Sequence, residues 1–202
     1  MNEDKNNKSS SAEEDKRLVL DFRSGETDSF DKLVIKYHGK VFNICFRFLG
    51  DYQDADDVSQ EIFLKAYRSL DRFRLESSFF TWLYRITVNT CKNKLKSLEY
   101  RYNKRTLKTD YTEDQNGPLK TLDIKDNKLS PYDALSNKEM MRAIKQAIDT
   151  LPPEQKTVVV LRDIEGLTYE EIKDVTDFKL GTIKSRLARA RMDLREKLRE
   201  IL

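Results

Sequence analysis

Cations gather in the predicted last helix of the chain, where the segment from Gly181 to Arg191 holds several basic residues and no acidic one. An α-helix fits the major groove of B-form DNA, so side chains near its N-terminus reach base edges while cations contact phosphates. We therefore predict that this helix contacts DNA. The candidates for base edges or phosphates are Thr182, Lys184, Ser185 and Arg186, and the candidates for phosphates are Arg189 and Arg191.

The residues before this helix predict the first half of a helix-turn-helix. Thr168 and Glu171 have the spacing of a capping box, and Leu167 and Ile172 occupy the positions of a hydrophobic staple. A break at 176–181 follows, and apolar residues three and four apart then run along the last helix. This order of elements is typical of a DNA-binding helix-turn-helix. It favours DNA contact over the alternative, a basic face that is merely solvated.

A second cationic stretch runs from Arg85 to Lys108, with eight basic residues and one acidic residue, and aromatic residues stand just upstream. Unpaired bases stack on aromatic rings while cations follow the backbone. The polar loop at 74–78 could form a pocket for one such base. Helical spacing favours a core role for most of the rings, so we expect only one or two to face DNA. The candidate contacts are Arg74, Ser77, Phe79, Trp82, Tyr84, Asn89, Lys92 and Asn93.

Five acidic residues lie between Asp51 and Glu61 without an intervening base. Asp54 is expected to cap the helix that follows, because carboxylates stabilise a helix N-terminus. Capping explains one or two of the acids, and a helix start lacks the loop geometry of a calcium site. A basic protein partner is therefore the better hypothesis for this cluster.

The chain as a whole predicts an all-α protein. Its 202 residues include only six glycines and four prolines, and runs of alternating β-type residues are few. Apolar residues three and four apart predict amphipathic helices, among them 30–50 and 79–98. The net charge of +3 says little by itself about nucleic-acid binding, because the distribution of charge decides it.

Few residues in the chain suit catalysis or metal binding. Cys45 and Cys91 stand in apolar-periodic helices and are expected to be small buried side chains, and His38 is the only histidine. No nucleophile–base pair or phosphate loop is present, so we predict a protein that is not an enzyme and has no metal or cofactor. No apolar run reaches the ~20 residues of a membrane span, and the polar N-terminus lacks a signal-peptide apolar region. We therefore expect a cytoplasmic protein.

Two small helical domains joined by a flexible linker are expected. Residues 108–133 are polar, contain glycine and proline, and lack sustained periodicity. Such a linker is long enough that the two flanking domains need not touch. The expected divisions are a disordered tail at 1–17, a helical domain at 18–98, the linker at 99–135 and the helix-turn-helix domain at 136–202.

Four segments, in this order along the chain, resemble bacterial sigma factors of the small extracytoplasmic-function (ECF) group. They read DADDVSQEIFLKAYRSLDRF (54–73), FFTWLYRITVNTCKN (79–93), LPPEQKTVVVLRDIEGLTYEEI (151–172) and GTIKSRLARAR (181–191). The resemblance covers nearly the whole chain after about residue 18. One departure is that Lys173 and Asp174 stand where the family usually has alanines.

The resemblance implies a sigma factor that binds RNA polymerase core and directs promoter-specific initiation. The aromatic and basic helix would read and open the −10 element, and the C-terminal helix-turn-helix would read the −35 element and touch the polymerase flap. An anti-sigma factor is a further implied partner and could hold the protein at the membrane. The residues matching the docking helix for the clamp of the largest polymerase subunit are Asp54, Asp57, Gln60 and Glu61.

Two other functions are compatible with parts of the sequence. A sigma-like decoy would only bind an anti-sigma factor, but such decoys usually carry a receiver domain and lack the basic DNA-facing residues. An autonomous helix-turn-helix repressor would use the C-terminal domain alone. That reading leaves residues 28–98 without a function.

Overall fold

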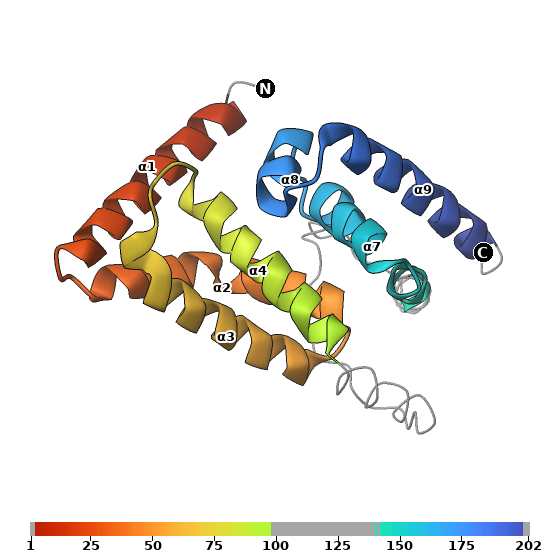
Figure 1. The fold of residues 1–202 in the computed structure, drawn as a ribbon, viewed down its shortest axis with the longest axis horizontal. Coiled ribbons are helices and arrows are strands. Elements are labelled where there is room, and N and C mark those ends of the chain that lie inside the picture. Colours follow the sequence, from red (N-terminus) through yellow and green to blue (C-terminus); the bar gives the residue numbers. More distant parts are fainter. Residues whose placement is uncertain (1–2, 98–139, 141, 200–202) are drawn as a thin grey trace, which may run out of the picture.

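The computed structural model describes residues 3–97, 140 and 142–199, and in them every regular element is a helix (Figure 1). The predicted all-α class is thereby confirmed. The 99–135 linker prediction lies outside the described residues. The elements are α1 (Glu3–Arg23), α2 (Asp28–Leu49), α3 (Tyr52–Ser69), η1 (Leu70–Arg72), α4 (Phe79–Lys96), a helix at 142–149, α7 (Pro153–Val159), a π-helical stretch η2 (Val160–Ile164), α8 (Tyr169–Thr176) and α9 (Leu180–Arg199).

The N-terminal segment is helical, and the prediction of a disordered tail at 1–17 is wrong for most of that range. Helix α1 packs against α2, and the carboxylate of Asp15 is only 2% exposed. This carboxylate accepts hydrogen bonds from Lys36 Nζ, at 2.6 Å, and from the Tyr37 hydroxyl. The polar composition concealed these long-range contacts, because a helix with low mean hydropathy can still be held by a few buried groups.

Helices α2, α3 and α4 pack on one another and form the core of the N-terminal part. Helix α2 ends at Gly50, whose φ of 79° lies in the left-handed region that favours glycine. The N-cap of α3 is Asp51, which accepts from the Asp54 backbone N–H at 2.8 Å, so the prediction that Asp54 caps this helix is wrong by three residues. Ser78 caps α4 by accepting from the Thr81 N–H at 3.1 Å.

The predicted helix-turn-helix is present. Thr168 and Glu171 form the predicted capping box, because the Glu171 N–H donates to the Thr168 hydroxyl and the Thr168 N–H donates to the Glu171 carboxylate. The turn follows Asp177, whose φ is 59°. Aspartate tolerates this conformation better than most residues. Helix α9 then buries Ile183, Leu187 and Ala190 against α7 and α8.

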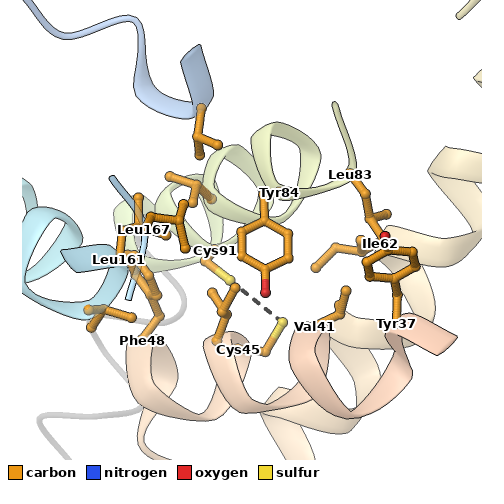
Figure 2. Close-up of a cluster of buried hydrophobic side chains, with 14 of the residues drawn as sticks. Tyr37, Val41, Cys45, Phe48, Ile62, Leu83, Tyr84, Cys91, Leu161 and Leu167 are labelled. Carbon is orange, nitrogen blue, oxygen red and sulfur yellow. Dashed lines mark hydrogen bonds between the residues drawn. The ribbon is translucent and has the colours of Figure 1, made fainter. Parts of the chain in front are cut away.

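The N-terminal and C-terminal parts pack together, although the linker length allowed them to stay apart. Their buried apolar side chains form a single cluster, and α4 contacts α8. Figure 2 shows Tyr84 and Cys91 of α4 near Leu161 and Leu167 of the C-terminal part. Cations add two contacts at the end of α2: Lys145 Nζ donates to the Gly50 carbonyl at 2.8 Å, and Lys156 Nζ to the Phe48 carbonyl at 2.9 Å.

Cys45 and Cys91 are fully buried on α2 and α4, with 3.7 Å between their sulfur atoms (Figure 2). Both are free thiols. The hydrogen bond between the two thiols, together with burial, raises the pKa of Cys91 well above its usual value. This agrees with the prediction that both residues are small buried side chains.

Removal of the Asp15 carboxylate should loosen α1. We expect Asp15→Ala to lower the free energy of unfolding by about 2 kcal/mol, because it leaves the buried Tyr37 hydroxyl without its acceptor and removes one of the acceptors of the Lys36 ammonium. Glu14→Ala is the matched control, because Glu14 pairs with the same lysine from a side chain that is 63% exposed. Urea unfolding followed by circular dichroism measures both variants. Equal losses would contradict the assignment of Asp15 as the anchor.

Candidate nucleic-acid and protein interfaces

The acidic cluster forms one exposed face of α3. Asp57, Gln60 and Glu61 are exposed, whereas Asp54 is half-buried and lies 3.5 Å from Lys94 Nζ on α4. Glu61 pairs with Lys65 one turn later at 2.6 Å. The structure therefore brings three of the four predicted docking residues onto one face and turns the fourth toward α4. An exposed acidic face of this kind suits a basic surface on a partner protein.

Apolar side chains continue this acidic face, and sequence reasoning missed them. Leu64 is 56% exposed and Tyr67 is 44% exposed, in the two turns after Gln60. Large apolar side chains on a surface next to charged ones are characteristic of binding sites. The available signal was the helical spacing, because Leu64 follows Gln60 by four residues and Glu61 by three.

The loop before α4 carries exposed polar side chains and a strained residue. Arg74 and Ser77 are exposed, and Leu75 has a φ of 58°, which is unfavourable for a leucine. The loop is held from α1, where Arg23 Nη2 donates to the carbonyls of Leu70 and Phe73. Helix α1 thus positions the loop that was predicted to hold an unpaired base.

Most of the aromatic cluster is core, as expected from its spacing. Phe79 is 3% exposed and packs against Tyr37, with 5.5 Å between ring centroids. Trp82 is half-buried and stacks on Phe73, at 4.8 Å and an interplanar angle of 25°. In this arrangement Phe79 is unavailable to a base, and Trp82 presents only part of its ring. Direct contact of Phe79 with DNA therefore has no support from its placement.

The remaining candidates on α4 divide between a solvent-facing row and a covered one. Asn89 and Asn93 are exposed one turn apart. Tyr84 is only 1% exposed, and its hydroxyl lies 3.5 Å from the Glu165 carboxylate of the C-terminal part. Lys92 is half-buried and lies over the Phe178 ring at 4.7 Å. In this arrangement Tyr84 is unavailable to DNA, and Lys92 is only partly accessible.

The cations of α9 differ in how they are held. Lys184, Ser185 and Arg189 are exposed, and Thr182 is half-buried. Arg186 pairs with Glu154 and lies 4.1 Å from the Phe178 ring centroid. Arg191 Nε donates to Asp163 at 3.0 Å, and this hydrogen bond raises the pKa of Arg191. The predicted basic face is therefore present, but two of its arginines are paired with acids of the same chain.

The contact surface between α4 and the helix-turn-helix, here called the seam, also engages Arg85, which was not among the predicted site residues. Arg85 Nε donates to the Asp174 carbonyl at 3.1 Å, and Nη2 lies 3.1 Å from the Asp177 carboxylate. Phe178 accompanies it in the seam. In the sequence, Arg85 stood out only as the start of the basic run and Phe178 did not stand out at all, because both residues act through contacts between distant segments.

Ionisable groups that are half-buried or buried cluster at one end of the seam. Burial raises the pKa of Glu165 above its usual value, although Arg47, Lys40 and the Tyr84 hydroxyl oppose this change. Burial lowers the pKa of Arg47. The same burial raises the pKa of Tyr84, which therefore stays a neutral hydroxyl and can donate to Glu165. Among the described residues, no three metal-binding side chains come close enough to hold an ion.

Comparison with protein families matches both parts of the chain. The model for sigma-70 region 2 matches residues 33–101, and that for sigma-70, region 4 matches residues 141–194. The RNA polymerase sigma-H factor of Pseudomonas aeruginosa is 39% identical over 190 residues, covering 94% of this chain and 96% of the relative. The chain belongs to the ECF RNA polymerase sigma factors. The sigma-E factor of Escherichia coli K12 is 35% identical and covers 93% of this sigma factor and 96% of the relative.

Solved structures agree on the fold of this sigma factor. CnrH, in complex with the cytosolic domain of CnrY, covers 93% of the chain with a TM-score of 0.65 and 23% identity, and 98% of CnrH is matched. RpoE of Bartonella quintana, in complex with NepR, covers 84% with a TM-score of 0.58 and 21% identity, and 96% of it is matched. A membrane-spanning helix is absent from the described residues. As a sigma factor, the protein directs transcription initiation.

Glu165→Gln should flatten part of the pH dependence of stability. A raised pKa means that the native protein binds this proton more tightly than the unfolded chain does, so stability falls as pH rises from 4.5 through the raised pKa. The glutamine side chain does not titrate, so the variant should not lose stability in this way as pH rises, and its amide oxygen still accepts from the Tyr84 hydroxyl. Urea unfolding at several pH values between about 4 and 7 compares the two proteins. Parallel stability curves would show that Glu165 is not buried in this way.

Proposed function

We propose that this sigma factor binds the core of RNA polymerase through α3 and reads a promoter at two places. The row of Asp57, Gln60 and Glu61 on one exposed face of α3 carries this proposal, because no contact within the N-terminal core requires it. The neighbouring Leu64 would add apolar area at the centre of that contact. The chain itself makes and breaks no bond, and it acts where the DNA is, in the cytoplasm.

Duplex DNA would be read by α9 and unpaired DNA by α4 and its loop. Lys184 and Ser185 lie exposed near the start of α9, where a recognition helix meets base edges and phosphates, and Arg189 lies exposed at its middle. Arg74 is exposed in the strained loop, and Asn89 and Asn93 are exposed farther along α4. Unstacking a base costs a few kcal/mol, which stacking and phosphate contacts at this site would offset. In this way α9 sets the register, and α4 holds the melted −10 strand.

An anti-sigma factor is proposed as a further partner. RpoE of Bartonella quintana was solved in complex with the anti-sigma factor NepR, and CnrH in complex with the cytosolic domain of CnrY. The decoy and repressor functions have less support. The cations that a decoy would lack are present on α9, and a repressor would not need the acidic face of α3.

Loss of the α3 face should remove promoter-dependent initiation. We expect Asp57→Ala/Gln60→Ala/Glu61→Ala to reduce retention on core polymerase by about tenfold or more, because central interface residues carry most of the binding energy. Transcription start sites are mapped with core polymerase on a library of promoter fragments. The start sites that depend on the wild-type protein should be absent when the triple variant replaces it. The matched control, Glu13→Ala/Asp31→Ala/Gln146→Ala, removes the same residue types from other exposed positions. Undiminished retention, or no start site that depends on the wild-type protein, would refute the proposal.

The α9 cations should set the salt dependence of duplex binding. We expect Arg189→Ala to lower the slope of log affinity against log salt by about one, because one phosphate contact and its counterions are lost. The effect should be similar for all duplex sequences. Arg17→Ala serves as the control, since its side chain is 85% exposed on α1. Fluorescence anisotropy with reconstituted holoenzyme measures the slopes. An unchanged slope for Arg189→Ala would remove α9 from the DNA interface.

A further inference from the structure

Arg23, the last residue of α1, places its guanidinium on the backbone where the loop before α4 begins. Its Nη2 donates to the carbonyl of Leu70, at 3.3 Å, and to the carbonyl of Phe73. The Phe73 N–H donates to the same Leu70 carbonyl at 3.1 Å. A hydrogen bond from a charged donor is stronger than one between neutral groups. Arg23 therefore fixes the turn of η1 from outside, together with the residue from which the loop at 74–78 departs.

The end of α1 that carries Arg23 is itself fixed by aromatic contacts. The centroid of the Phe22 ring lies 5.2 Å from that of Tyr67 on α3 and 5.8 Å from that of Phe30 on α2. Helix α1 also contacts η1 and α4 (Figure 1). Arg23 is half-buried, and its Nε is buried without a hydrogen-bond partner among the described residues. The packing of α1 and the two backbone acceptors therefore determine where this guanidinium lies, rather than solvent.

Phe73 links this restraint to the first turn of α4. Its ring is 4% exposed and stacks on Trp82 with 4.8 Å between centroids. Trp82 is half-buried, so part of the indole remains open to a base. Leu75, whose φ of 58° is unfavourable for its side chain, packs partly buried against the same core. A shift of the Phe73 backbone would therefore move both the indole and the strained loop beside it.

We propose that Arg23 is a positioning residue for the capture of an unpaired base. It holds the Phe73 carbonyl so that Trp82 and the loop at 74–78 keep the shape that receives the base. This inference rests on the proposed function, in which α4 and its loop hold the melted −10 strand. Arg23 does not itself contact DNA, because its guanidinium is directed to the backbone at the start of the loop. Its effect is therefore on base capture and not on phosphate binding.

Three variants separate positioning from charge. Arg23→Ala removes the donor, whereas Arg23→Lys keeps a cation with three donors for the two carbonyls. Arg17→Ala is the matched control, because it removes an arginine of the same helix whose side chain is 85% exposed. Circular dichroism checks that each chain is folded. If Arg23→Ala is not, Arg23→Gln with the control Arg17→Gln replaces the alanine pair.

The first measurement is the fluorescence of Trp82, which is the only tryptophan in the sequence. In the isolated chain, Arg23→Ala should shift the emission to longer wavelength, because the indole loses part of its contact with Phe73 and becomes more exposed. Arg23→Lys and Arg17→Ala should leave the emission near that of wild type. An unchanged emission in Arg23→Ala would overturn the proposal.

The second measurement is a double-mutant cycle between Arg23 and the bases of the melted strand. Holoenzyme reconstituted with core polymerase binds the labelled non-template strand of a promoter that depends on the wild-type protein. Each base in turn is replaced by an abasic site. With the wild-type protein, one abasic position should weaken binding about tenfold, as the loss of a stacked base would.

Arg23→Ala should remove most of this position-specific effect. The intact strand should bind about fivefold more weakly, and the same abasic position should then weaken binding only about twofold further. The slope of log affinity against log salt should not change, because no phosphate contact is lost. Arg23→Lys should keep the tenfold effect of the abasic site, and Arg17→Ala should match wild type.

The outcomes separate this role of Arg23 from the proposed function. A tenfold abasic effect that persists in Arg23→Ala, a lower salt slope, or an equal loss of affinity at every position would overturn the role of Arg23 alone. If no abasic position weakens binding by the wild-type holoenzyme, the proposed capture of a base is refuted, and the role of Arg23 with it.

Discussion

Helix α4 is buried on two sides, and the arrangement of the other described helices depends on this. It packs against α2 and α3 within the N-terminal part and against α8 of the C-terminal part. Tyr84 and Cys91, which are almost fully buried, lie where these two contacts meet (Figure 2). Apolar burial contributes roughly 25 cal/mol per Å², so a helix covered on two sides stabilises both parts together. The polar groups of α4 are confined to the part of its surface that these contacts leave uncovered.

Charge at the contact between the two parts follows from how helices end. The last carbonyls of a helix have no partner within it, and cations from elsewhere in the chain can satisfy them. Lys145 and Lys156 do this at the end of α2, and Arg85 does it at the end of α8. A chain rich in both charges therefore holds its two parts together by pairing helix ends with cations.

The same chemistry links this closed arrangement to the work of a sigma factor. Groups that bind phosphates are cations with free donors, and such groups equally bind carbonyls, carboxylates and aromatic rings within the chain. Under the proposed function Lys92 and Arg186 would contact DNA, and in this structure both lie over the Phe178 ring. The proposed docking face lies on α3, whereas the contacts with the helix-turn-helix are made by α4.

The sequence by itself determined the features that depend on local order: the helical class, the capping box of Thr168 and Glu171, the burial of Cys45 and Cys91, and the exposed face of α3. Each follows from residues three or four apart. Tertiary structure decided the rest: α1 is held by Asp15, Asp51 caps α3, the Tyr84 hydroxyl faces Glu165 of the C-terminal part, and Phe178 lies between two cations. These outcomes depend on side chains that are distant in the chain or on competition between neighbouring caps. Helical periodicity carries no information about either.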